Sequence, residues 1–232
     1  ATELGLPGIS SPAEDAEIAR NIVLSEVYGV PVHIAHVSTR GGMQLIREAK
    51  KRGVKVTCET CPHYIALTDA EIAGFNTAAK VNPPLRSEED RLAVIEAIAD
   101  GTVDCIVTDH APHSKEDKDG GMYDAPNGIS GLETSYAVCY TTLVKSGVIS
   151  AERLSELMTF NPARLLKVEC GDLKKGALAD ITLVDNDAEW VVEPEKFASK
   201  GKNTPFAGRR VQGRVEYTLM GGRIVYARKE EI

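Results

Sequence analysis

An aspartate and two histidines stand together where an apolar segment ends. Residues 103–108 are rich in β-branched side chains, and Asp109, His110 and His113 follow directly. Buried parallel strands appear as short hydrophobic runs, and α/β folds place ligands and catalytic groups at the carboxyl ends of such strands. A plain turn is the alternative, because Asp often begins turns. Two of the chain's five histidines beside one acid favour a functional site.

His36 ends a second apolar segment, residues 30–37, and small polar residues follow it. His33 lies three positions earlier on the same expected strand, so the two imidazoles should point to opposite faces. An imidazole and a carboxylate from neighbouring strand ends form a common zinc ligand set. We therefore expect His36 and Asp109 to face one opening and bind a metal ion, although a strand histidine without a ligand role remains the alternative for His36.

The segment Cys58-Glu59-Thr60-Cys61 has the spacing of a zinc or redox motif. A zinc knuckle needs a second pair at suitable spacing, and the sequence has none. A redox motif should open a helix, whereas Pro62 and the preceding strand indicate a strand-to-loop junction. A structural role is therefore expected for both cysteines. His63 either supports the site from behind or caps the loop.

Two loop segments could hold a polar or anionic ligand. Asn82 precedes two prolines that fix the backbone, which would hold its amide toward a ligand, and a rigid turn explains the same residues equally well. The segment Gly-Ile-Ser-Gly at 128–131 could bring backbone N–H groups toward an anion at a helix N-terminus. It could equally join a loop to a helix.

The composition is that of an ordinary globular protein with a formal net charge of −7 over 232 residues. The sequence contains no basic face for nucleic acid and no apolar run long enough to cross a bilayer. The first residues lack the pattern of a signal peptide. Five cysteines, an odd number, favour free thiols in a reducing compartment. We expect a cytoplasmic α/β protein.

The elements that must position these residues alternate between helix and strand. Helices are predicted over 11–28, 42–52 and 87–99, strands over 30–37, 54–59 and 103–108, and long loops over 61–86 and 114–130. Helical patterns return at 131–146, 151–158 and 162–168, and short strands follow at 171–173, 176–185 and 214–226. Such an order predicts a parallel sheet in residues 1–168 and a small β-rich domain with a C-terminal tail in residues 169–232.

Several of these segments together resemble the dihydroorotase family of the cyclic amidohydrolase superfamily. The resemblance rests on Ala-His-Val-Ser-Thr at 35–39, Val-Asn-Pro-Pro-Leu-Arg at 81–86, Thr-Asp-His-Ala-Pro-His at 108–113 and Gly-Ile-Ser-Gly-Leu-Glu-Thr at 128–134, in the family's order and spacing. Gly-Ala-Leu-Ala-Asp at 176–180 resembles the family's tail signature. Hydantoinase- and allantoinase-like relatives usually carry a different residue where His113 stands.

The resemblance implies a (β/α)8 barrel of the TIM type with a small β-sandwich appendage. It implies hydrolysis of dihydroorotate to carbamoyl aspartate, and the reverse cyclisation in pyrimidine biosynthesis, on a binuclear zinc centre. His36 would bind one metal ion, while Asp109 would bind the other and carry a proton from the attacking water to the leaving ring nitrogen. The substrate would be held by Asn82, His113, Asn127 and Gly128.

The chain departs from the family pattern in what it lacks. The His-x-His pair of the first strand, the bridging Lys or Asp and the ligand His of the fifth strand are all absent. We therefore expect the C-terminal part of a dihydroorotase, with about strands 6–8 of the barrel. Such a part should be inactive alone and bind zinc weakly or not at all. Its exposed strand edges should favour self-association.

Two alternative functions fit the same residues less well. One is a non-catalytic dihydroorotase-like scaffold that supports a carbamoyltransferase, and the presence of both His36 and Asp109 disfavours it. The other is a hydantoinase- or allantoinase-like hydrolase, and His113 disfavours that. No nucleic-acid or membrane partner is expected.

Overall fold

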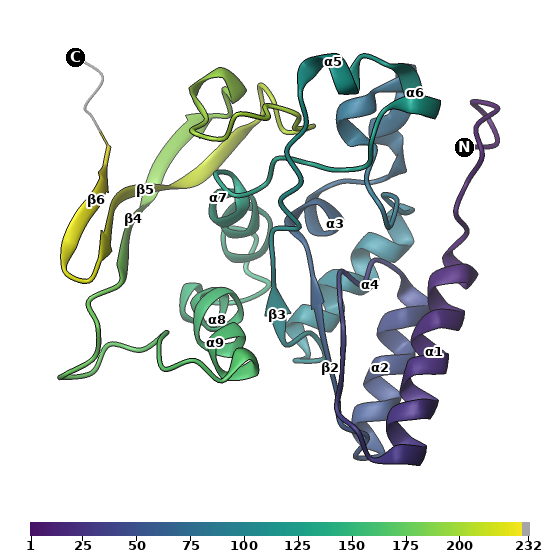
Figure 1. The fold of residues 1–232 in the computed structure, drawn as a ribbon, viewed down its shortest axis with the longest axis horizontal. Coiled ribbons are helices and arrows are strands. Elements are labelled where there is room, and N and C mark those ends of the chain that lie inside the picture. Colours follow the sequence, from purple (N-terminus) through teal and green to yellow (C-terminus); the bar gives the residue numbers. More distant parts are fainter. Residues whose placement is uncertain (229–232) are drawn as a thin grey trace.

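Three parallel strands form the sheet that carries the predicted site residues (Figure 1). They are β1 (Val32–Ile34), β2 (Val56–Thr60) and β3 (Cys105–Ile106), paired in that order. The computed structural model describes residues 1–228. The predicted alternation of three helices with three strands over residues 11–108 is confirmed for these principal elements, but the strands are shorter than expected. His36 and Asp109 consequently lie beyond the strand ends.

Three helices pack along this sheet, each with a clear reason for where it begins. α1 (Ser11–Tyr28) has a proline in its first turn and ends at Gly29, which takes a left-handed φ of 66°. α2 (Arg40–Lys51) begins after Thr39, whose hydroxyl accepts a hydrogen bond from Gly42 N–H. α4 (Glu88–Ala99) is capped in the same way by Ser87. α1 and α4 match the predicted ranges to within one residue.

Alternate strand residues separate an apolar face from a polar one. Ile34, Val56 and Cys58 are buried with α-helical residues such as Ile46 and Ile98. Each fully buried Ile contributes about 1.5–3 kcal/mol to folding. His33, Thr57 and Glu59 alternate with them and so occupy the opposite face, where the His33 ring bonds to both of the others. The sheet therefore carries a hydrophobic side toward the helices and a polar side away from them.

The two long loops expected at 61–86 and 114–130 contain short helices, which corrects the prediction. The first holds α3 (Pro62–Ala66) and the 3-10 turns η1 (Asp69–Phe75) and η2 (Thr77–Ala79). The second holds α5 (Lys115–Lys118) and α6 (Gly121–Asp124). Ser114 and Asp117 form a reciprocal capping box that starts α5. Pro62 opens α3 rather than a loop, because proline suits a first helical turn.

The later helical region consists of short segments. α7 (Ser135–Cys139) continues into the π-helical turn η3 (Tyr140–Val144). α8 (Ala151–Ser155), the π-helical turn η4 (Glu156–Phe160) and α9 (Asn161–Leu166) follow one another without a gap. The helix expected from 131 begins four residues later. Within residues 1–228, the structure contains no helix with the length and apolar character needed to cross a membrane.

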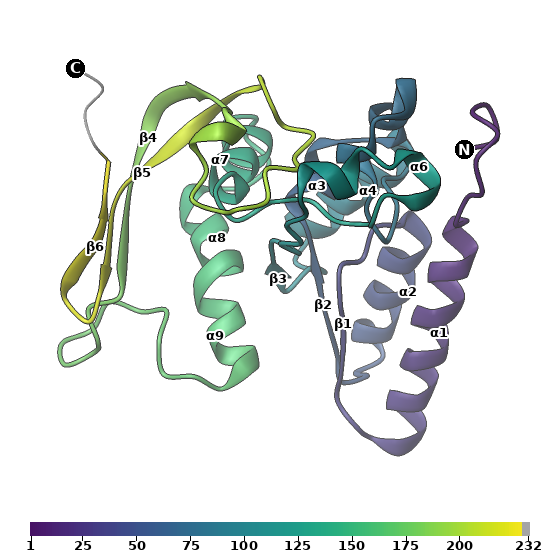
Figure 2. The ribbon, with the colours of Figure 1, turned by 45° about the horizontal axis from the view of Figure 1, so that its top comes forward.

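The C-terminal part of the chain forms an antiparallel sheet at one end of the molecule (Figures 1 and 2). Its strands are β4 (Ile181–Val191), β5 (Arg210–Met220) and β6 (Arg223–Ala227), with the 3-10 turn η5 (Pro194–Lys196) between the first two. Gly221 and Gly222 both take positive φ and make the two-residue hairpin between β5 and β6. The strand predicted at 171–173 does not form, because that segment has no ladder partner.

Candidate metal and substrate site

His36, Cys61, His63 and Asp109 follow the carboxyl ends of the three parallel strands. Because such ends meet at one edge of a sheet, the four residues lie at the same edge. One ligand atom each from Cys61, His63 and Asp109 lies within 4.8 Å of the others. The charge of His36 acts on both His63 and Asp109. Asp109 thus has two close donor residues that were not predicted as ligands, while His36 is not part of this group of donors and acts on Asp109 electrostatically.

Both predicted metal ligands have unusual backbone conformations. His36 has φ 40° and Asp109 has φ 46°, a region that non-glycine residues seldom adopt. Hydrogen bonds fix the chain beside each of them: Val37 N–H donates to Glu59 O at 2.9 Å, and Val107 N–H donates to Thr60 O at 2.9 Å. The strand alternation that separated His33 from His36 therefore ends before His36, since β1 stops at Ile34.

The Asp109 carboxyl group is half-buried, and its environment acts on it in three ways. Burial raises its pKa, the His36 ring beside it lowers it, and the Glu59 carboxylate raises it further, with a net increase. His33 Nε2 lies 3.0 Å from Glu59 Oε2, so the polar face of the sheet adjoins the site. Glu59 was not predicted to act there, although its position at the end of β2 was visible in the sequence.

His63 is 1% exposed and lies inside α3, so it does not cap a loop. Its ring meets the Tyr64 ring edge-on, with centroids 4.2 Å apart. Burial, with the nearby His36, lowers the pKa of His63 to about 3. Its Nε2 atom is buried and has no hydrogen-bond partner. A neutral imidazole with an unpartnered nitrogen therefore lies behind Asp109.

Cys58 and Cys61 occupy different environments despite their motif-like spacing. Cys58 is in the hydrophobic core under the helices, where its thiol approaches Thr102 O at 3.4 Å, and burial raises its pKa to about 12. Cys61 lies in a second buried cluster, and burial raises its pKa as well, with further contributions from Asp109 and Glu59. Both thiols are free. They do not act as a pair, and only Cys61 adjoins the site.

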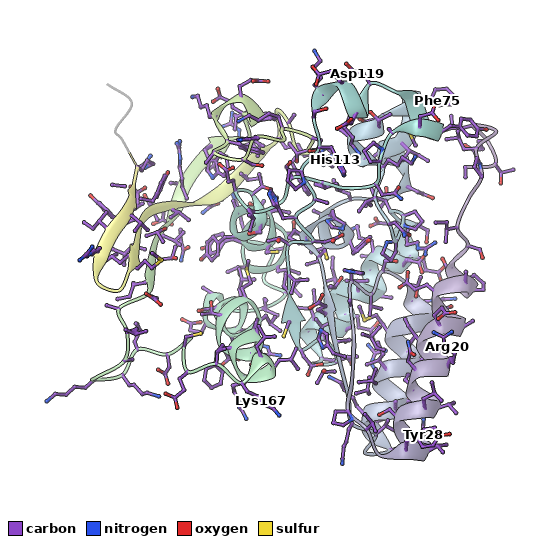
Figure 3. All side chains as sticks on the ribbon, viewed as in Figure 1. Arg20, Tyr28, Phe75, His113, Asp119 and Lys167 are labelled. Carbon is purple, nitrogen blue, oxygen red and sulfur yellow. The ribbon has the colours of Figure 1, made fainter. Side chains whose placement is uncertain are left out.

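The predicted substrate residues lie on loops that contact one another. His113 Nε2 lies 3.0 Å from Asn127 O, and Asn82 is joined to the next residue by a cis peptide bond. Gly128 N–H donates to Lys80 O at 2.9 Å, so in this structure it is not free to hold an anion. Gly128 instead allows a close turn, because an added Cβ would stand 2.6 Å from Ala111 Cβ. In Figure 3, Asp119 lies at the upper edge of the molecule, and His113 lies nearer its centre.

Asn203 was missed by the sequence argument, yet it joins two of these loops. Its side-chain oxygen accepts from His113 N–H at 2.8 Å, and its amide nitrogen donates to Gly128 O at 2.9 Å and Ala111 O at 3.2 Å. The residue is some ninety positions from His113 in sequence. No local pattern signals a contact over such a separation.

A cavity of about 520 Å³ adjoins these loops. Its walls include Lys80, Arg86, Tyr123 and Asn127, together with the first residues of the chain. A smaller cavity of about 220 Å³ is lined by Glu14, His33 and Pro83, among others. Asn127 is the predicted site residue that borders the larger cavity, and the metal-ligand cluster lies outside both.

Comparisons with known proteins place this geometry in a family. The amidohydrolase family model matches residues 11–225. The dihydroorotases of Geobacter metallireducens and Acetivibrio thermocellus are 52% and 53% identical to the chain over 98% of its length, which is 53% and 54% of theirs. The solved L-hydantoinase (dihydropyrimidinase) of Arthrobacter aurescens superposes with a TM-score of 0.88 at 33% identity, over 94% of this chain and 50% of that one.

A D-hydantoinase from Bacillus sp. AR9 gives the same TM-score, 0.88, at 27% identity, over 95% of this chain and 50% of that one. The chain therefore spans about half the length of the curated relatives that it matches. The family match covers the parallel sheet, its helices and most of the C-terminal sheet. The chain belongs to the amidohydrolase family.

Proposed function

We propose that this chain is the C-terminal part of a cytoplasmic dihydroorotase, which hydrolyses the ring amide of dihydroorotate to N-carbamoyl-aspartate and catalyses the reverse cyclisation in pyrimidine biosynthesis. The proposal is supported by the position of His36 and Asp109 just beyond the carboxyl ends of β1 and β3, the two strands that flank β2, and by the electrostatic effect of His36 on Asp109. The identity of about half with proteins named dihydroorotase supports this reaction over others in the family.

The architecture proposed for the whole protein is a (β/α)8 barrel with a β-sandwich appendage. The strands β1 to β3 would be barrel strands 6–8, within residues 1–168, and β4 to β6 would belong to the appendage, within residues 169–232. In support, β1 pairs only with β2 within residues 1–228. Val27 and Tyr28, on α1, are 69% and 72% exposed, as expected of a surface that further barrel elements would cover.

The donor atoms near Asp109 suit a zinc ion, because imidazole nitrogen and carboxylate oxygen are usual zinc ligands. Two ions would need more ligands than His36 and Asp109 supply, so the other half of the protein would provide the rest. When bound, zinc would polarise the scissile carbonyl and make water a better nucleophile near neutral pH. Asp109 would take a proton from the attacking water and deliver it to the ring nitrogen as the amide bond breaks.

The remaining predicted residues would orient the substrate. His113 and the Asn82 amide offer hydrogen-bond groups to the ring and its carboxylate, and Asn127 borders the adjacent cavity. Gly128 would act by permitting the turn that places His113, since its own N–H is engaged with Lys80. Imidazole and amide donors would be well suited to an anionic substrate in a protein of net negative charge.

The test uses a chain of full length, made by joining these 232 residues to the N-terminal half of the Acetivibrio thermocellus dihydroorotase. We expect it to turn over dihydroorotate, and Asp109→Ala to abolish turnover while the circular dichroism spectrum is unchanged. Asp119→Ala, at the exposed end of α5, is the matched control and should retain activity. Undiminished activity of the Asp109→Ala protein would refute the assignment.

A hydantoinase-like activity is the second candidate, because a solved hydantoinase superposes closely on the chain. A substrate panel separates the two: preference for dihydroorotate over hydantoins and dihydropyrimidines supports the first proposal, and the reverse preference supports the second. The carbamoyltransferase partner stays a prediction, which co-purification with that enzyme would test.

A further inference from the structure

Cys61 and His63 adjoin the site, yet the proposed hydrolysis uses neither. Both side chains are almost fully buried, and both have a donor atom within 4.8 Å of the Asp109 carboxylate. We infer that Cys61, His63 and Asp109 form a binding site of their own for a single borderline-soft divalent cation, of which Zn²⁺ is the type. The inference does not rest on the reaction proposed above, because it concerns only donors that this chain contains.

The donor chemistry fits such an ion. Thiolate sulfur, imidazole nitrogen and carboxylate oxygen are the three ligand types that zinc takes in proteins, at bond lengths of about 2.0–2.3 Å. Tetrahedral ligands at those lengths are about 3.3–3.8 Å apart. Because the donor atoms lie within 4.8 Å of one another, each separation needs to shorten by no more than about 1.5 Å. Side-chain rotation can supply that movement without displacing a strand.

A second, independent observation points to a ligand. His63 Nε2 is buried with no hydrogen-bond partner, although its residue is only 1% exposed. Buried polar atoms are almost always paired, because an unpaired one loses its hydration without compensation. A cation bound between the Asp109 carboxylate and the Cys61 thiolate would give this nitrogen a partner. Cys61 would give up its thiol proton to solvent as the ion binds.

The backbone holds the three donors in place before any ion arrives. Cys61 directly follows β2, and its carbonyl accepts from Tyr64 N–H at 3.0 Å, which fixes the first turn of α3 around His63. Asp109 is held in its left-handed conformation beyond β3. Such preorganisation lowers the entropic cost of binding.

Because Asp109 belongs to both ligand sets, an ion held by Cys61 and His63 would take a carboxylate that hydrolysis needs. Cys61 and His63 would bind the same ion as Asp109, and so would complete its coordination with donors that this chain contains. The expected stoichiometry is therefore one ion per chain, and not two.

The test is titration of the metal-free 232-residue chain with Co²⁺, carried out in a Cys170→Ser background because Cys170 is the exposed cysteine. A cysteine ligand gives a thiolate-to-cobalt charge-transfer band in the near ultraviolet, and carboxylate or imidazole ligands do not. We expect one Co²⁺ per chain with this band. Cys61→Ser should remove the band, and His63→Gln should weaken binding by about tenfold or more.

Cys58→Ser is the matched control, since Cys58 is equally buried and lies on β2 three residues before Cys61, but faces the helices. It should leave the band and the affinity unchanged. Co²⁺ bound without the band, a band that survives in Cys61→Ser, or no binding at all would each overturn the inference. The wild-type spectrum decides the matter even if Cys61→Ser fails to fold. None of these results bears on turnover by the full-length chain, so the two proposals fail separately.

Discussion

His36 and Asp109 both have a strained backbone, with φ in the left-handed region. A non-glycine residue in the left-handed region costs about 1–3 kcal/mol, and such residues persist only where the surroundings hold them. Here the neighbouring residues Val37 and Val107 are tied to β2 by backbone hydrogen bonds. These hydrogen bonds to β2 offset the cost of the left-handed conformation at both positions.

Gly128 offers a direct measure of how closely the site loops pack. It has φ 150°, and an added Cβ would stand 2.6 Å from Ala111 Cβ and 2.9 Å from His113 Nε2. We therefore expect Gly128→Ala to lower the free energy of unfolding by about 1–3 kcal/mol. Gly120→Ala is the control, because Gly120 has an ordinary φ of −68° and the nearest atoms to its added Cβ are 3.5 Å away. Chemical denaturation measures both, and equal stabilities would contradict the packing argument.

Some residues of the candidate site could be predicted from the sequence, and others could not. Asp109 and His36 were predictable because each ends an apolar run, and a strand end is where α/β folds place chemistry. Cys61 and His63 were not predicted as ligands because no second cysteine pair accompanies them, whereas the donors here are side chains of different types that follow β2 and β3. Asn203 depends on tertiary contacts with Ala111 and Gly128, which no local pattern records.

At the scale of elements, a buried ion pair joins three segments around the site. Arg86 Nη2 lies 3.1 Å from Glu14 Oε2, and Arg86 Nε donates to Ser38 Oγ at 3.1 Å. Glu14 Oε1 in turn accepts from Ser38 N–H at 2.7 Å. The pair thus connects the first turn of α1, the turn that follows His36 and the segment that follows Asn82.

Breaking this pair should be costly, because the two side chains are only 7% and 11% exposed. Removing one partner of a buried pair leaves an uncompensated charge, at about 3–5 kcal/mol. We expect Glu14→Gln and Arg86→Met each to lower the free energy of unfolding by about 3–5 kcal/mol. The double variant should lower it by less than the sum of the two single effects. The exposed pair Arg40–Glu89 is the control and should contribute about 0–1 kcal/mol. A double-mutant cycle by urea denaturation checks this, and additive losses would contradict it.

Elements were predictable where capping residues and periodicity agreed. Pro12 in the first turn and Gly29 at the C-cap mark the ends of α1, and Ser87 caps α4, as local rules require. Strands were predicted too long, because apolar residues continue past the point where ladder pairing stops. The capping box at Ser114 and the two glycines before β6 are local sequence patterns that indicate a helix start and a hairpin, and neither was used in the prediction. The absent strand at 171–173 shows that strand formation depends on a partner strand.

At the scale of the whole molecule, the two ends of the structure carry exposed surfaces. Figures 1 and 2 show α1 at one extreme of the molecule and β6 at the other. β1 is an edge of the parallel sheet, paired only with β2 in the part of the chain described, and all of β6 is exposed. Unpaired edges and apolar helix faces are the surfaces on which chains associate.

The last prediction follows from that exposure: the 232-residue chain should self-associate as its concentration rises. Val27 and Tyr28 are 69% and 72% exposed on α1, and Leu173 is 86% exposed near the other end. Because two large apolar side chains are exposed side by side on α1, and the barrel proposed above would continue there, Val27→Lys should shift sedimentation equilibrium toward monomer more than Leu173→Lys. Adding the N-terminal half of a dihydroorotase relative should displace self-association through the same face, and Val27→Lys should weaken that complex too. A wild-type chain that stays monomeric at high concentration, or a larger effect of Leu173→Lys, would show that α1 is not the surface through which the chain associates.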